Sequence, residues 1–138
     1  MIHPVGLGAK TGTLPFVADV PGNLGSAHFQ EQESDETIFL DVVRGDSYII
    51  ELGIKDIDFI KIDVEGFELE VLQGLRKTIE RYRPILTFEY HAQDFNDDHF
   101  YGFLDVLVGY TLVELVFAPA KASFIDKLAF NYVKCGMP

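Results

Sequence analysis

The chain has 138 residues, of which 48% are hydrophobic, so it is long enough to bury the core of one domain. Its formal net charge of −11 repels phosphate backbones, and no cluster of lysine and arginine offsets that repulsion, so we expect no nucleic-acid partner. The single cysteine, Cys135, rules out an internal disulfide. With no signal-peptide pattern and no apolar run near the about 20 residues of a membrane helix, we expect a cytoplasmic protein without a membrane partner.

The N-terminal third of the chain is predicted to contain strands and a long loop. Residues 2–8 have the pattern of a strand, residues 10–13 supply a turn, and residues 14–17 form a short return strand. Residues 37–43 are again rich in β-branched and aromatic side chains. The intervening residues 19–36 include an acidic segment and are predicted as a solvated loop.

The glycines Gly6, Gly8 and Gly12 superficially resemble a phosphate-binding loop. Such a loop needs a helix that begins directly after the glycines, so that its amide hydrogens point at the ligand. Pro15 and the β-prone residues before it oppose a helix there. We therefore predict an ordinary turn.

The segment 57–91 is predicted to be a strand–helix–strand unit, preceded by a short helix over residues 47–52 that Asp46 caps. Residues 58–64 form the first strand and residues 85–89 the second. Apolar residues recur at helical spacing between the strands: Phe67, Val71, Leu72, Leu75 and Ile79. Arg83 and Pro84 stop that helix, because proline lacks an amide hydrogen and disfavours a helical residue before it.

Acidic and imidazole side chains gather where the two strands of this unit end. The crossover between such strands is right-handed almost without exception, so the strands lie parallel and their carboxyl ends face the same way. Ligands of open α/β sheets bind outside those ends. The side chains expected to converge there are Asp63, Glu65, Glu68, Glu89 and His91.

The C-terminal part is predicted to be a helix followed by two strands. The helix starts at Asn96 or Asp97, and Gly109 ends it in the left-handed conformation. The strands are residues 111–116 and 128–135.

Residues 57–91 contain a specific pattern: Ile60-Lys61-Ile62-Asp63-Val64-Glu65-Gly66, then Glu68, Val71-Leu72, Gly74, Arg83-Pro84 and Glu89. This pattern resembles the signature of the FkbM-type S-adenosylmethionine-dependent methyltransferases. The resemblance implies an α/β fold, namely part of a Rossmann-like class I methyltransferase domain. It implies a mostly parallel sheet whose antiparallel C-terminal strand lies between two neighbours.

On that template the strands at 2–8, 58–64, 85–89, 111–116 and 128–135 correspond to the third through seventh of the family. The chain then resembles the C-terminal half of the catalytic domain, without the first two strand–helix units. The main cofactor-binding loop of the family lies in the missing units, so we expect this chain to be inactive alone. We also expect an exposed sheet edge that invites self-association.

The resemblance implies the following site. Asp63 and Glu65 are catalytic, Glu68, Glu89 and His91 bind the substrate, and Leu7, Gly8 and Asp63 contact S-adenosylmethionine. As anions at neutral pH, Asp63 and Glu65 suit the orientation or deprotonation of a hydroxyl that faces the sulfonium. The expected reaction is O-methylation of a small molecule or sugar.

Three alternatives stay open. Glu65 and Glu68 could merely cap a helix while Lys61 neutralises Asp63. The chain could be a non-enzymatic remnant, or a half-domain that docks on a separate N-terminal piece. It could also be a metal-dependent enzyme that uses the oxygen and imidazole groups of residues 91–99, although their spacing fits no metal template and we predict no metal.

Overall fold

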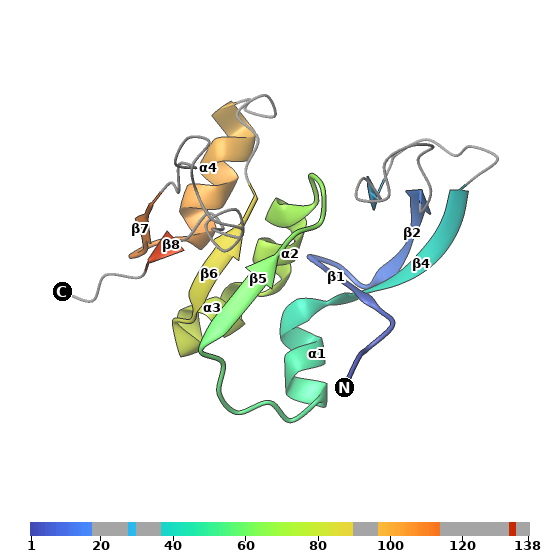
Figure 1. The fold of residues 1–138 in the computed structure, drawn as a ribbon, viewed down its shortest axis with the longest axis horizontal. Coiled ribbons are helices and arrows are strands. Elements are labelled where there is room, and N and C mark those ends of the chain that lie inside the picture. The colour runs from blue at the N-terminus through green and yellow to red at the C-terminus, as the bar shows by residue number, and fades with distance from the viewer. Residues whose placement is uncertain (18–27, 30–36, 90–96, 114–132, 135–138) are drawn as a thin grey trace, which may run out of the picture.

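The computed structural model describes residues 1–17, 28–29, 37–89, 97–113 and 133–134, arranged as shown in Figure 1. The elements in chain order are β1 (Gly6–Gly8), β2 (Gly12–Val17), β3 (His28–Phe29), β4 (Thr37–Arg44), α1 (Gly45–Glu51), β5 (Phe59–Ile62), α2 (Glu68–Gly74), α3 (Arg76–Tyr82), β6 (Ile85–Phe88), α4 (Asp97–Val106), β7 (Thr111–Leu112) and β8 (Val133–Lys134). This succession confirms the predicted α/β class.

The described strands form two sheets of four, with the orders β1-β4-β2-β3 and β5-β6-β8-β7. β1 pairs with β4 and β5 with β6 in parallel, whereas the other pairs are antiparallel. The prediction of one mostly parallel sheet is therefore wrong, because both sheets are mixed and β1 lies in a different sheet from β5. The physical reason is β4, whose eight residues pair with β1 in parallel and with β2 in the opposite direction.

β1 meets the rest of the chain through α2. A Cβ atom built on Gly74 would lie 2.0 Å from the carbonyl oxygen of Gly8, so only glycine permits this approach of helix to strand. The close contact puts the carboxyl end of β1 beside α2, as Figure 1 shows. The chain bends after Gly8 and no helix begins there, which agrees with the predicted turn.

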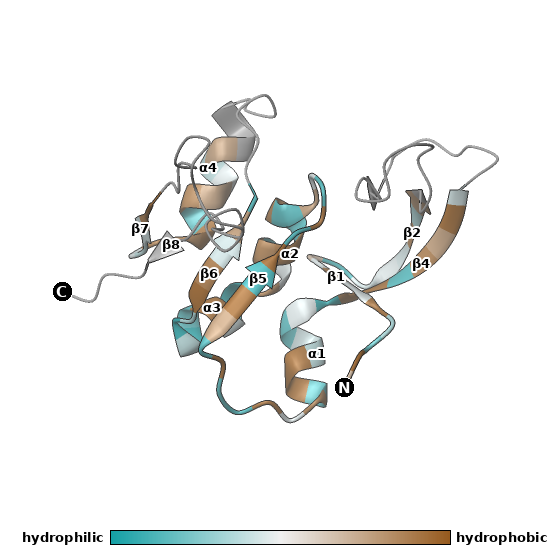
Figure 2. Ribbon diagram, viewed as in Figure 1, coloured by the Kyte–Doolittle hydropathy of each residue, from teal (hydrophilic) through white to brown (hydrophobic). Residues whose placement is uncertain are grey.

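The predicted strand–helix–strand unit is present. β5 and β6 are parallel and in register from Phe59 opposite Ile85 to Ile62 opposite Phe88. Alternate strand residues face the helices, where burial of each large apolar side chain contributes about 1.5–3 kcal/mol. The core residues that join these strands to the three helices α2, α3 and α4 are Ile62, Leu69, Val71, Leu72, Leu75, Ile79, Leu86, Phe88, Phe103, Val106 and Leu107. Figure 2 shows hydrophobic colours along β6 and a hydrophilic start of α2.

The predicted helix between β5 and β6 is divided at Leu75, whose φ and ψ of −99° and 9° depart from helical values. Because of this break, α3 has its own N-terminus, whose amides need hydrogen-bond acceptors. Asp46 serves this start: its carboxylate accepts hydrogen bonds from the Thr78 amide (2.9 Å), the Thr78 hydroxyl (2.8 Å) and the Lys77 amide (3.2 Å). The prediction that Asp46 caps residues 47–52 is wrong, because α1 already begins at Gly45 and no side chain caps it.

α3 ends at the predicted stop. Arg83 adopts the left-handed conformation with a φ of 50°. Its guanidinium donates to the carbonyl oxygens of Val108 (2.9 Å) and Gly109 (2.6 Å) and lies 4.2 Å from the ring centroid of Tyr110. These contacts fasten the end of α3 to the turn after α4.

The C-terminal elements agree with the prediction as far as they are described. Gly109 has a φ of 78°, which confirms the left-handed residue after the helix. β8 lies antiparallel between β6 and β7, as expected for the last strand. The remainder of the predicted strands 111–116 and 128–135 lies largely outside the described residues. Within the described part of the chain, no helix combines the length and the apolar character needed to cross a membrane.

Candidate functional site

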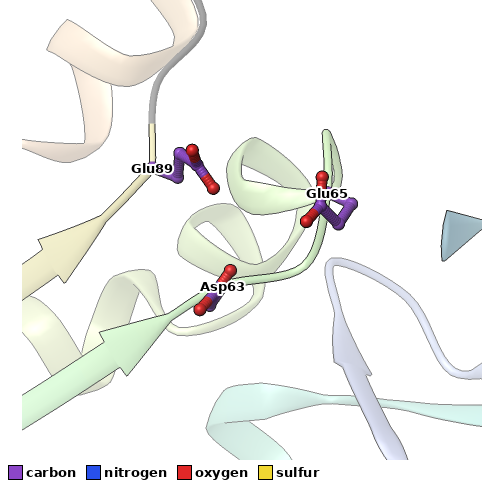
Figure 3. A group of neighbouring side chains, drawn as sticks. All are labelled: Asp63, Glu65 and Glu89. Carbon is purple, nitrogen blue, oxygen red and sulfur yellow. The ribbon is translucent and has the colours of Figure 1, made fainter. Parts of the chain in front are cut away.

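Three carboxylates lie together past the carboxyl ends of β5 and β6. Asp63 follows β5 directly, Glu65 stands two residues further, and Glu89 follows β6 directly (Figure 3). One carboxylate oxygen of each lies within 4.8 Å of the others, and all three residues are exposed. The predicted convergence of these side chains is confirmed.

The parallel register of β5 and β6 explains this convergence. Ile62 pairs with Phe88, so Asp63 and Glu89 are the next residues along two neighbouring strands that end at the same edge of the sheet. The burial of Ile62 and Phe88 fixes the ends of the strands, and the acidic residues emerge into solvent where burial stops.

Glu65 is brought to the cluster by a tight turn. The amide of Phe67 donates to the carbonyl of Val64 (3.3 Å), and the two central residues, Glu65 and Gly66, have positive φ values of 47° and 95°. Positive φ at both central positions is the pattern of a type I′ turn. Gly66 adopts it at little cost, whereas the left-handed backbone of Glu65 costs about 1–3 kcal/mol. Strain of this kind concentrates at functional sites.

The Glu68 side chain lies beneath this turn. The residue is 6% exposed, and its two carboxylate oxygens accept hydrogen bonds from the amides of Val64 (3.1 Å) and Gly66 (2.9 Å). Each such bond to a charged acceptor contributes about 1.5–3 kcal/mol, which is enough to offset the strain at Glu65. Glu68 therefore does not join the exposed group, and its predicted contact with substrate stays a prediction.

Lys61 forms an ion pair with Asp63, with 2.5 Å between Nζ and a carboxylate oxygen. Both side chains are nearly half exposed, at 43% and 47%, and pairs of this kind contribute about 0–1 kcal/mol. The contact anticipated between Lys61 and Asp63 is present. It is weak enough for a ligand to displace.

The predicted cofactor contacts, Leu7 and Gly8, lie at the carboxyl end of β1. Leu7 is partly buried against the core, and a Cβ on Gly8 would meet Val42 Cγ1 at 2.9 Å and Phe67 Cε1 at 3.3 Å. Phe67 thus joins β1 to the turn that carries Glu65. Both residues are used in packing, and their role toward a cofactor stays a prediction. His91, the other predicted substrate contact, lies outside the described residues.

Sequence reasoning missed two features of the site. The first is the left-handed conformation of Glu65, which the Glu65-Gly66 pair directly after a strand could have indicated. The second is that Asp63, Glu65 and Glu89, whose convergence was predicted, are also close enough in the described residues to hold a metal ion, whereas residues 91–96 lie outside the described residues. Carboxylate oxygens are the ligands that Mg²⁺ and Mn²⁺ prefer, but exposed acidic groups are common without an ion.

A parallel strand–helix–strand unit with acidic side chains past both strand ends is an α/β arrangement, and ligands of open α/β sheets generally bind at that edge of the sheet. The family model of the methyltransferase FkbM domain matches residues 2–114. The chain therefore belongs to the FkbM methyltransferase family. A search of curated proteins gave no match, and neither did a search of solved structures.

Proposed function

We propose that the chain acts in S-adenosylmethionine-dependent O-methylation of a hydroxyl of a small molecule or sugar, together with an N-terminal piece that supplies the first two strand–helix units of the family. The observation that carries the proposal is the cluster of Asp63, Glu65 and Glu89 in a chain of the FkbM family. The strand order β5-β6-β8-β7 with an antiparallel β8 supports a class I, Rossmann-like arrangement.

The three carboxylates suit both the methyl donor and the hydroxyl acceptor of such a reaction. S-adenosylmethionine supplies an electrophilic methyl group on a positively charged sulfur. Anionic oxygens favour that charge and also accept hydrogen bonds from hydroxyl groups. Leu7 and Gly8, at the end of β1, would border the cofactor.

In this proposal Asp63 binds the hydroxyl group that receives the methyl. Its carboxylate would orient that hydroxyl and take its proton as the oxygen becomes nucleophilic, a role that typically accelerates a reaction by about 10²–10⁴-fold. Glu65 and Glu89 would hold neighbouring hydroxyls of the acceptor, with His91 beside Glu89. Lys61 must exchange its contact with Asp63 for solvent when the acceptor enters.

The test is transfer of a labelled methyl group from S-adenosylmethionine to a panel of hydroxyl-bearing acceptors, by the chain combined with an N-terminal piece that carries those two units. Asp63→Asn removes the proton acceptor at nearly constant shape, and kcat should fall about 100-fold or more. The matched control is Glu70→Gln, which makes the same change of charge at an exposed position in the first turn of α2. Full activity of Asp63→Asn in this combination, or no transfer by the combination with the unmodified chain to any acceptor, would refute the proposal.

The alternative of a metal-dependent carboxylate enzyme is favoured by one observation, the 4.8 Å grouping of the carboxylate oxygens. The ion pair of Lys61 with Asp63 opposes it, because the ammonium occupies one of the oxygens. Calorimetric titration with Mn²⁺ and transfer in the presence of a chelator distinguish the two. The main proposal expects transfer to survive chelation, and the alternative expects it to be lost.

A further inference from the structure

The turn that follows β5 is fastened from below by one side chain. Glu68 opens α2, yet its carboxylate is turned back toward the preceding loop and not outward to solvent. Its two oxygens accept hydrogen bonds from the amides of Val64 and Gly66, at 3.1 Å and 2.9 Å. One carboxylate therefore holds the residues on both sides of Glu65.

The position of the Glu65 carboxylate depends on this turn. With a φ of 47° the Glu65 backbone is in a conformation that non-glycine residues rarely adopt, and the same conformation brings its side chain to Asp63 and Glu89 (Figure 3). If the turn relaxed to ordinary backbone angles, the Glu65 side chain would leave the group. The two hydrogen bonds to Glu68 oppose this relaxation, together with the hydrogen bond from the Phe67 amide to the Val64 carbonyl.

We infer that Glu68 is a positioning residue: it binds neither substrate nor cofactor but holds the turn that sets Glu65 beside Asp63. The inference deepens the proposed function and rests on it for the catalytic consequence. It replaces the predicted contact of Glu68 with substrate by an indirect role. A displacement of catalytic groups by about 1 Å lowers rates by about 100-fold, so a hold of this kind matters for turnover.

Glu68 could also stabilise α2 simply by its charge, because the helix dipole favours an acidic residue in the first turn. The two roles differ in their demand on geometry. A dipole effect needs only a negative charge near the helix start, so Glu68→Asp preserves it. The hold on two amides needs the full length of glutamate, so Glu68→Asp and Glu68→Gln both weaken it.

Amide hydrogen exchange followed by NMR tests the hold directly and needs no activity. In Glu68→Gln and Glu68→Asp, the amides of Val64 and Gly66 should exchange about tenfold faster or more. The amides of Leu72 and Ile79, inside α2 and α3, should be unchanged and so report that the chain remains folded. Unchanged exchange at Val64 and Gly66 would overturn the inference.

The methyl-transfer assay tests the consequence. In Glu68→Gln, kcat per folded molecule should fall about tenfold or more while the KM for S-adenosylmethionine stays within about twofold, because binding groups are retained and their alignment is lost. Glu70→Gln, on the same helix, should match the unmodified chain in both measurements. A released turn with unchanged kcat would overturn the positioning role. Absence of transfer by the unmodified chain combined with its N-terminal piece would instead remove the proposed function, and exchange would still decide whether Glu68 holds the turn.

Discussion

Gly66 has a backbone conformation that favours glycine, although there is room for a larger side chain. Its φ is 95°, and a Cβ built on it would meet nothing within 4 Å, so any penalty for alanine there comes from the backbone alone. Gly53 offers a matched position, with a φ of 66° and no neighbour within 4 Å of its Cβ, in the loop after α1.

We expect Gly66→Ala and Gly53→Ala each to lower the free energy of unfolding by about 1–2 kcal/mol, measured by urea denaturation. Only Gly66→Ala should also lower methyl transfer, since it disturbs the turn that carries Glu65. Equal loss of transfer in both variants would show that transfer follows stability and not the geometry of this turn.

The residues of the site were largely predictable, because their chemistry is visible in the sequence. Asp63 and Glu89 follow strands whose apolar pattern is unambiguous, and the handedness of the crossover then brings them together. The inward turn of Glu68 was not predictable, since its sequence position at a helix start is shared by exposed and buried acids alike. The left-handed conformation of Arg83 was not predicted either, because its contacts come from the turn after α4, which is distant in sequence.

At the scale of elements, α3 and α4 are joined by Arg76 and Asp105. The guanidinium donates to the carboxylate of Asp105 at 2.5 Å and 3.3 Å and to its carbonyl at 3.3 Å, and it also contacts Glu80. The hydrogen bond from Arg76, followed by its charge, lowers the pKa of Asp105 below the ordinary aspartate value. The same partners raise the pKa of Arg76, which stays charged at any accessible pH.

The pH dependence follows from the direction of the Asp105 shift. A carboxyl whose pKa is lower in the folded chain stabilises the fold above its unfolded pKa, and this contribution is lost as the pH falls through the folded pKa. Both side chains are substantially exposed, at 42% and 65%, so the contribution is small. In Arg76→Met the pKa of Asp105 should rise toward its ordinary value, as followed by NMR titration of the carboxyl. Lys77→Met, which removes the neighbouring charge on α3, is the control. An equal rise of the Asp105 pKa in this variant would show that the general field of the positive charges, and not the pair with Arg76, lowers it.

Elements were less predictable than residues where tertiary contacts decide their limits. The division between α2 and α3 at Leu75 falls inside an unbroken helical pattern. The carboxylate of the buried Asp46 accepts the hydrogen bonds of the Lys77 and Thr78 amides at the start of α3. The separate sheet around β4 was missed for a related reason. Strand pairing depends on which edges are available, and a sequence pattern shows strands but not their neighbours.

At the scale of the whole molecule, β5 forms an edge of its sheet among the described residues, with β6 as its partner. Phe59 on β5 is 50% exposed, and Ile85, opposite it on β6, is 45% exposed. An open strand edge beside exposed apolar side chains is a surface on which a second copy can pair. The net charge of −11 opposes such pairing at low salt, and salt screens that repulsion.

We therefore predict that the chain self-associates in a concentration-dependent way, and more strongly as salt is raised. Phe59→Lys places a charge on the edge and removes apolar surface, so the association constant from sedimentation equilibrium should fall about tenfold or more. Phe39→Lys makes the same replacement at a comparably exposed position, 55%, on β4 in the other sheet, and should leave the constant unchanged. A chain that stays monomeric at every concentration and salt would contradict the prediction. An equal loss in both variants would show that the interface does not involve β5, because Phe59 lies on that strand and Phe39 does not.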